Sequence, residues 1–198
     1  MTESLGNEAG PRSRLLEGMA RAVARKGYPD TTIADIVREA GVSRRTFYEH
    51  FTTKAECFVA LYEAASRNAL QVLQSAIDPA HEWQAQVTHA LKAYLGAMAM
   101  NPVLLRTLFI EILGLGAEGL AARRRVNQEI AGFMLEVVNG RRAAGRRSPP
   151  LTLEMATAVV GGINELVLQA IEQDRAHRLE ELAAPASQLV RAVTGAGA

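Results

Sequence analysis

Apolar residues recur along this chain at intervals of three and four positions, the spacing that predicts amphipathic α-helices. The first such segment starts near Arg12 and stops at Lys26-Gly27. A second, shorter stripe covers Ile33 to Ala40 and is followed by Gly41, a residue suited to the left-handed conformation that ends many helices. No segment convincingly shows the alternation of strands, so the pattern predicts an all-α fold of about nine helices.

Short polar residues mark where the next helices begin. Thr32 precedes the second stripe and has Asp35 three residues later. Ser43 precedes a third, very short helix, and Thr53 precedes a fourth, with Glu56 three residues later. Hydroxyl groups at these positions accept hydrogen bonds from the free backbone N–H groups of the first turn, and the acidic partner completes a capping box. The caps therefore define the starts of three helices.

The rest of the chain carries longer stripes between clear breaks. Asp78-Pro79 ends the fourth helix, and Asn101-Pro102 is typical of a cap followed by a first helical residue. The nearly continuous apolar run from Val103 to Leu113 predicts a buried helix. The basic stretch Arg141 to Pro150 predicts a loop, and a last helix carries apolar residues from Leu179 to Val193.

The capped helices suggest a division of the chain near residue 54. We expect residues 1-54 to form a loose N-terminal tail and a three-helix helix-turn-helix domain, and residues 55-198 to form a larger helical domain. The fourth helix runs to about Ala76 and is long enough to belong to both domains. The two domains are therefore expected to be mechanically joined.

Composition narrows the class of protein but does not indicate a partner. Hydrophobic residues make up 48% and charged residues 22% of the chain, which is typical of a packed core, and the formal net charge is only +1. The single cysteine, Cys57, excludes an intramolecular disulfide and a cysteine-based zinc site, and the histidines are scattered. No apolar stretch suits a membrane span or a signal peptide, so we expect a cytoplasmic protein with no membrane partner and no metal or other cofactor.

Two short capped helices joined by a tight, glycine-containing turn are typical of a helix-turn-helix, whose second helix enters the major groove of DNA. Val42 before the third helix and Phe47 inside it hold the positions of a hydrophobic staple. With Phe47 facing inward, this helix leaves several polar side chains outside: Arg44, Arg45, Thr46, Tyr48 and His50. The pattern therefore predicts double-stranded DNA as a partner.

The segment TTIADIVREAGVSRRTFYEHFTTKAE resembles the signature of the TetR family of bacterial transcriptional repressors. The resemblance covers roughly residues 12 to 62 and depends most on the spacing of Tyr48, Phe51 and Lys54. It implies a repressor that binds operator DNA as a homodimer and is released by a small-molecule effector. Whether this chain represses or activates is left open by the residues themselves.

The resemblance also implies roles for single residues. Carried over position by position, it implies DNA contacts for the helix-cap residues Thr32 and Ser43. It implies base contacts for Arg44, Arg45 and Thr46, and contacts with the sugar-phosphate backbone for Tyr48, His50 and Lys54. Thr32 and Lys54 stand at the beginnings of helices, where backbone N–H groups favour a phosphate. An arginine that binds guanine O6 and N7 contributes about 1–3 kcal/mol of discrimination. Taken alone, each residue is better explained as a solvated charge or as ordinary packing, and only the set in this spacing favours DNA binding.

The second domain shows no catalytic signature such as a nucleophile elbow, a phosphate-binding loop or a zinc-protease helix. Candidates for a ligand pocket are apolar residues with a few polar neighbours: Trp83, His89, Tyr94, Met98, Phe109, Met134 and Asn164. Few of them titrate, so we expect a largely neutral, hydrophobic effector. Each of these residues is also compatible with an ordinary core position.

The helix that contains Gly161-Gly162 is apolar on more than one face, and paired glycines inside a helix favour a close approach by another backbone. Together with the last helix it predicts a four-helix dimer interface across a two-fold axis, formed by Val159, Ile163, Val167, Ile171, Leu182, Ala186, Leu189 and Val193. Packing within one chain is the alternative.

Two other functions are compatible with the sequence. One is a helical DNA-binding protein without ligand sensing, and the other is a helical enzyme whose helix-turn-helix pattern is coincidental. Basic clusters at Arg123 to Arg125 and at Arg141 to Arg147 are compatible with a second nucleic-acid site. A solvated helix face for the first cluster and a loop for the second are better explanations.

Overall fold

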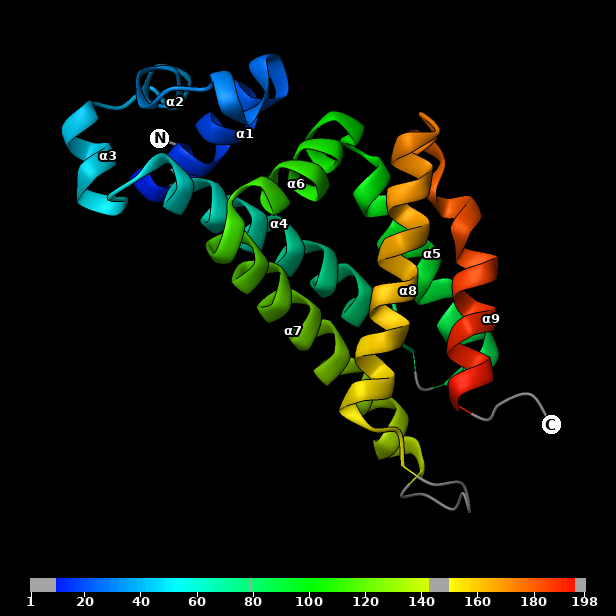
Figure 1. The fold of residues 1–198 in the computed structure, drawn as a ribbon. Helices are drawn as coiled ribbons and strands as arrows, with labels where there is room; N and C mark the ends of the chain where they lie inside the picture. Colours follow the sequence, from blue (N-terminus) through cyan, green and yellow to red (C-terminus); the bar gives the residue numbers. More distant parts are fainter. Residues whose placement is uncertain (1–9, 79, 143–149, 195–198) are drawn as a thin grey trace, which may run out of the picture. The chain divides into compact units, whose positions relative to one another are not determined.

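The protein is described from a computed structural model, in which residues 10–78, 80–142 and 150–194 are described. Nine α-helices and one 3-10 helix occupy most of these residues, which contain no strand (Figure 1). The all-α prediction is confirmed. The chain divides into two compact units, through Ala64 and from Ala65, and each is described by itself. The predicted N-terminal tail and basic loop fall largely outside the described residues.

The first unit contains three helices and the beginning of a fourth, namely α1 (Pro11–Asp30), α2 (Ile33–Ala40), α3 (Arg44–His50) and α4 (Lys54–Ser75). The Thr32 hydroxyl accepts a hydrogen bond from the Asp35 N–H, and the Asp35 carboxylate accepts one from the Thr32 N–H. The Ser43 hydroxyl accepts from the Thr46 N–H at 3.0 Å. The predicted caps of α2 and α3 are therefore confirmed.

Two glycines turn the chain between these helices. Gly27 has a φ of 77° and interrupts the end of α1, where the sequence predicts a stop. Gly41 has a φ of 62° and ends α2 in the predicted left-handed conformation. Side chains with a Cβ atom rarely adopt this region, so both turns favour glycine. The short turn at Gly41 lets α3 begin only a few residues after α2 ends.

The cap of α4 differs from the predicted box in one contact. The Thr53 hydroxyl accepts a hydrogen bond from the Glu56 N–H at 3.0 Å, as expected. The Glu56 carboxylate, however, accepts from the N–H of Thr52 at 2.6 Å. A glutamate side chain is long enough to reach one residue further back, so the carboxylate satisfies a donor that lies just outside the helix.

A close contact between α1 and α2 supports the helix pair. A Cβ atom at Gly18 would lie 2.6 Å from the carbonyl oxygen of Ile36 and 2.8 Å from Ala40, so the two backbones touch at this glycine. Phe47 of α3 and Phe58 of α4 are fully buried in the same unit. The helix-turn-helix is therefore held on a packed core.

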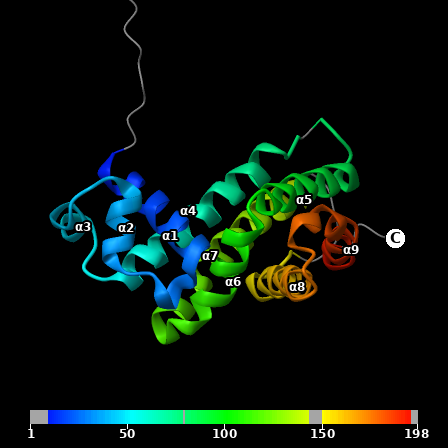
Figure 2. The same ribbon diagram turned by 90° about the horizontal axis from the view of Figure 1, so that it is seen from above.

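The second unit contains the rest of α4 and six further elements, namely α5 (Trp83–Ala99), α6 (Pro102–Gly114), α7 (Gly116–Arg142), α8 (Leu153–Glu172), the 3-10 helix η1 (Ala176–Leu182) and α9 (Ala183–Thr194). Its long helix α8 packs against α7 and α9, and α5 packs against η1 and α9 (Figures 1 and 2). Asn101 caps α6 and Pro102 is its first residue, as predicted.

The structure corrects the prediction that α6 is a buried helix, because only one side of it is covered. Leu105, Leu108 and Ile112 are buried, but Val103 and Ile110 are 52% and 42% exposed. A continuous apolar run covers every face of a helix, whereas the neighbouring helices cover only one of them. The run therefore predicts a helix without showing how much of it is covered.

The last predicted helix is divided in two. Leu179 and Leu182 belong to η1, and α9 begins at Ala183. Pro185 has no N–H with which to continue a hydrogen-bonded helix from the preceding turn. The chain restarts so that Pro185 falls in the first turn of α9, where its missing donor is tolerated.

The helices of the described residues differ from membrane spans. No single helix among them is both long and apolar enough to cross a membrane, and α5 and α6 meet the criterion only as a pair that is bent by 91°.

Gly119 of α7 allows a close approach to the end of α6. A Cβ atom there would lie 1.8 Å from the carbonyl oxygen of Ile112, so we expect Gly119→Ala to lower the free energy of unfolding by about 2 kcal/mol. Gly132, in the same helix, has open space around a Cβ atom, and Gly132→Ala is expected to raise stability by about 0.5–1 kcal/mol. Urea unfolding followed by circular dichroism measures both. Equal effects would contradict the close approach.

Candidate nucleic-acid interface

Helix α3 has one buried side and one exposed side. Phe47 is fully buried, and its ring centroid lies 5.5 Å from that of Tyr48 and 5.8 Å from that of Phe51. Most of the predicted DNA-contacting side chains of this segment are exposed, namely Ser43, Arg44, Arg45, Tyr48 and His50, and Thr46 is half-buried. Tyr48 is 60% exposed, which is unusual for an aromatic ring. The helix therefore presents basic, hydroxyl and aromatic groups together.

The two arginines of α3 differ in their partners. The Arg45 Nε lies 3.1 Å from the Glu49 Oε1 one turn along the helix, with both side chains largely exposed. Arg44 makes no ion pair or hydrogen bond within the part of the chain that the structure describes. An exposed pair of this kind contributes little stability and exchanges readily. Arg44 is therefore the guanidinium group that is available without any rearrangement.

Asp35 joins α1 to α2 by a cluster of hydrogen bonds. Its carboxylate accepts from Lys26 Nζ at 2.8 Å, from Arg38 Nη2 at 2.7 Å and from the hydroxyl of Thr32 at 2.7 Å. The bond from Lys26, followed by those from Thr32 and Arg38, holds the pKa of Asp35 well below its usual range. The residue is therefore ionised at neutral pH and fixes the start of α2.

The same cluster changes what Thr32 offers to DNA. The resemblance implies that its hydroxyl and N–H groups bind a phosphate. Both groups donate to the Asp35 Oδ2 instead, at 2.7 Å and 3.0 Å. A phosphate at this position would have to compete with a carboxylate, so Thr32 is a weaker candidate than the resemblance implies.

Lys54 is also engaged within the fold. Its Nζ donates to the carbonyl oxygens of Tyr28 and Pro29 at 2.9 Å and 3.2 Å, and it lies 4.3 Å from the centre of the Tyr28 ring. These contacts join the start of α4 to the end of α1. An ammonium group has three donors, so one remains for a phosphate.

Cys57 is a free thiol that is completely buried in α4. Burial raises its pKa to about 12. A thiol in this state carries almost no reactive thiolate at neutral pH, which disfavours a redox role.

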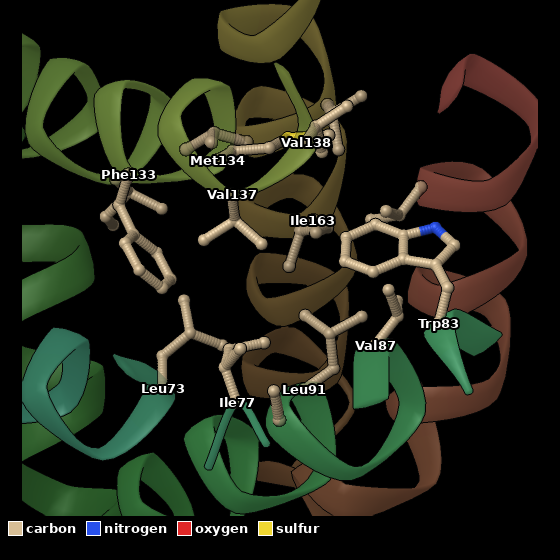
Figure 3. Close-up of a pocket in the computed structure, with 15 residues that line it drawn as sticks. Leu73, Ile77, Trp83, Val87, Leu91, Phe133, Met134, Val137, Val138 and Ile163 are labelled. Carbon is tan, nitrogen blue, oxygen red and sulfur yellow. The ribbon is translucent and has the colours of Figure 1, made fainter. Parts of the chain in front are cut away.

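The second unit contains an apolar cavity (Figure 3). It has a volume of about 550 Å³, including the part open to solvent. It is lined from α4, α5, α7, α8, α9 and the segment after α4 by Leu73, Ile77, Trp83, Val87, Ala90, Leu91, Ile130, Phe133, Met134, Val137, Val138, Val159, Val160, Ile163 and Val190. Every lining residue is apolar apart from the indole N–H of Trp83. Such a wall suits a hydrophobic ligand.

Of the pocket candidates from the sequence, Trp83 and Met134 line this cavity. Tyr94 is buried in a different apolar cluster, against which Met98 and Phe109 pack. His89 is exposed, so the prediction that it lines a pocket does not hold for this cavity. The remaining candidate, Asn164, is buried and bound to Asn127. Most of the other lining residues belong to apolar helix stripes, which the sequence shows without indicating the side that faces a cavity.

The residues predicted for a dimer interface lie mostly inside the chain. Val159, Val167, Ile171 and Ala186 are at most 2% exposed, and Ile163 is also buried, while Leu182, Leu189 and Val193 are half-buried. They pack into the two apolar clusters of the second unit. Intramolecular packing, the alternative to a dimer interface, therefore accounts for most of this set. The large apolar side chains of α8 that are exposed are instead Leu153 and Met155.

Other candidate sites gain no support. No group of His, Cys, Asp and Glu among the described residues is arranged to hold a metal ion. Arg124 is exposed on α7, as a solvated helix face predicts, and the cluster from Arg141 to Arg147 lies outside the residues whose side chains are described.

The N-terminal unit is similar in sequence to known regulators. Residues 15–61 match the family model described as bacterial regulatory proteins, tetR family. The HTH-type transcriptional regulator TtgR of Pseudomonas putida is 42% identical over 53 residues, which are 27% of this chain and 25% of TtgR. The matched part therefore spans about a quarter of the length of this curated relative.

The fold is similar to solved structures over most of the chain. The fatty acid degradation regulator FadR of Bacillus halodurans has a TM-score of 0.78 and 17% identity, with 92% of this chain and 95% of that chain covered. FadR of Bacillus subtilis, solved in complex with stearoyl-CoA, has a TM-score of 0.76 and 16% identity, with 92% and 97% covered. Identities this low show the shared fold alone.

The capped helices α2 and α3, with the exposed side of α3, define the first unit as a helix-turn-helix. The match at residues 15–61 is to the tetR family of bacterial regulatory proteins, the family that the sequence of this segment resembles. The relatives named above are described as regulators.

The Asp35 cluster predicts a pH-dependent difference between the protein and Asp35→Asn. Because the folded pKa is lowered, the ionised group stabilises the fold above the unfolded pKa of about 4, and this contribution is lost as the pH falls below it. We expect the variant to be less stable at neutral pH and the difference to shrink below pH about 4. Urea unfolding at several pH values measures it. A difference that persists unchanged in acid would show that ionisation of Asp35 does not contribute.

Proposed function

We propose that this protein is a DNA-binding transcriptional regulator, acting as a repressor in the cytoplasm, that binds an operator as a homodimer and is released by a small hydrophobic effector. The observation that carries the proposal is the exposed side of α3, where Arg44, Arg45 and Tyr48 stand opposite the buried Phe47. The N-terminal residues of such a helix are those that contact base edges in a major groove.

The cavity supports the effector part of the proposal. Its apolar wall buries hydrocarbon surface favourably, at roughly 25 cal/mol per Å². One structural relative was solved with stearoyl-CoA, whose acyl chain is also hydrophobic. We infer that an apolar molecule occupies the cavity of this chain as well.

Helix α4 is the element proposed to couple effector and operator. Its first turn holds Lys54 against the end of α1, and Leu73 near its other end lines the cavity. A ligand that shifts the Leu73 end would change the conformations open to the helix-turn-helix. Coupling of this kind is reciprocal, so operator DNA would also weaken effector binding.

A homodimer is proposed because a two-fold protein matches a near-palindromic operator, whose half-sites lie roughly 34–36 Å apart. The buried residues of α8 and α9 are poor candidates for the interface. The outward side of α8 is a better one, because Leu153 and Met155 are 44% and 46% exposed and Gly161 has open space beside it. Sedimentation of the protein with Met155→Glu tests this face.

Selection of bound DNA from a random pool tests the DNA-binding proposal directly. We expect the enriched sequences to share two related half-sites with a fixed spacing, since each protomer contacts one of them. Recovery of a pool without any common sequence would contradict sequence-specific binding.

Two variants separate base contacts from backbone contacts. We expect Arg44→Ala to relax specificity at one base pair per half-site, with a loss of about 1–3 kcal/mol for the preferred base. Lys54→Ala is expected to weaken binding to all sequences alike and to reduce the salt dependence by about one phosphate contact. Arg67→Ala removes an exposed arginine outside the helix-turn-helix and serves as the control. Titrations at several salt concentrations measure all three.

An unchanged sequence preference in Arg44→Ala would contradict its role at the bases. If Lys54→Ala weakens binding without changing the salt dependence, Lys54 acts only by holding the end of α1.

A further inference from the structure

The cavity wall restricts the charge of any molecule that it holds. No lining side chain is charged, and the walls from α7 and α8 consist of aliphatic, methionine and phenylalanine side chains (Figure 3). An ionised group placed among them would lose its hydration without gaining a partner, at a cost of several kcal/mol. The part of a ligand that enters the cavity is therefore uncharged.

A polar pair stands directly beyond this wall. Asn164 follows Ile163 on α8, and Asn127 precedes Ile130 by three positions on α7. Asn127 also lies seven positions before Met134, so it shares the face of α7 that lines the cavity. The Asn164 Nδ2 donates to the Asn127 Oδ1 at 3.0 Å. The two amides thus meet between α7 and α8. Each lies three or four positions along its helix from a lining residue, Ile130 or Val160, and neither is a lining residue itself.

The pair keeps hydrogen-bonding capacity for a third group. The bond between them uses one N–H of Asn164 and the oxygen of Asn127. Within the described residues no other hydrogen bond is found for these side chains, which leaves the Asn127 NH₂ and the Asn164 oxygen. Neither atom is among the fully enclosed side-chain atoms of the described residues that lack a partner, so each keeps at least a small exposed surface. A donor and an acceptor side by side match a hydroxyl group, and the donor alone matches a carbonyl.

Packing alone does not require this pair. On α8, Ile163 belongs to the apolar cluster around the cavity, and Val167 belongs to the second cluster of the unit. Asn164 is 9% exposed and separates the two. Apolar side chains of similar volume at such a position are often as stable or more stable than a buried polar pair. A polar pair beside an otherwise apolar cavity therefore points to recognition.

We propose that the effector is an uncharged, mainly hydrocarbon molecule with one hydroxyl or carbonyl group, which Asn127 and Asn164 bind while the hydrocarbon part fills the cavity. This inference rests on the effector role proposed above. By this proposal, the ionised part of any ligand stays outside the cavity, and the phosphate groups of a coenzyme A thioester are one example.

The single tryptophan of the chain makes the test direct. Trp83 lines the cavity, so its fluorescence reports an occupant, and thermal unfolding gives a second measure of binding. The probes are para-propylphenol, para-propyltoluene and para-propylbenzoate, which differ mainly in carrying a hydroxyl, a methyl or a carboxylate group. We expect the phenol to bind about tenfold tighter than the toluene and the benzoate to bind at least tenfold more weakly than the phenol.

Two variants test the pair itself. Asn164→Leu is expected to lower the preference for phenol over toluene by about tenfold, because the hydroxyl loses its partners. Asn127 is half-buried, and Asn127→Leu is also expected to lower the preference for phenol over toluene. This variant replaces Asn164→Leu in the test if Asn164→Leu does not fold. Gln128→Leu makes the same kind of replacement at an exposed position of α7 and is expected to leave the preference unchanged.

Each failure has its own meaning. If no probe changes the fluorescence or the melting temperature, the effector role of the cavity and this inference are both overturned. If phenol and toluene bind with the same ratio in the protein and in both asparagine variants, only the role of the pair is overturned. Benzoate that binds as tightly as the phenol would overturn the exclusion of charge.

Discussion

The orientation of the helix-turn-helix depends on one buried carboxylate. Asp35 accepts hydrogen bonds from Lys26 at the end of α1, from Arg38 on α2 and from the cap residue Thr32. These donors come from two helices and the turn between them, so the start of α2 is fixed against α1. Helix α3 follows after the single left-handed residue Gly41 and takes its direction from α2. The presentation of Arg44 is therefore set by a group that contacts no DNA in the proposed mode.

Local features of the first unit could be predicted from the sequence. The caps at Thr32 and Ser43 and the turn at Gly41 involve partners three or four residues apart, and residue type and spacing determine them. The contacts of Lys54 could not be predicted in this way. Its carbonyl partners at Tyr28 and Pro29 are more than twenty residues away, and only the packing of α4 on α1 brings them together. The resemblance indicated the importance of Lys54, but the structure shows what it touches.

The second unit shows a different limit. An apolar stripe reveals that a face is covered but does not identify the covering element. Of the residues predicted for a ligand pocket, Trp83 and Met134 line the cavity, whereas Tyr94 packs in another apolar cluster. Val167, predicted for a dimer interface, is buried within its own chain. The pairing of Asn127 with Asn164 joins residues 37 positions apart, and nothing in their local sequence indicates it. Side-chain chemistry could be predicted here, but the neighbours could not.

The length of α4 has a mechanical consequence. The helix has 22 residues, and at about 1.5 Å per residue it forms a rod of about 33 Å. A rod of this length converts a tilt of about 5° at one end into a displacement of about 3 Å at the other. Bistable helix packing commonly produces shifts of this order in regulatory proteins. In the proposed coupling, a small tilt at the Leu73 end of α4 would therefore be amplified geometrically at the Lys54 end.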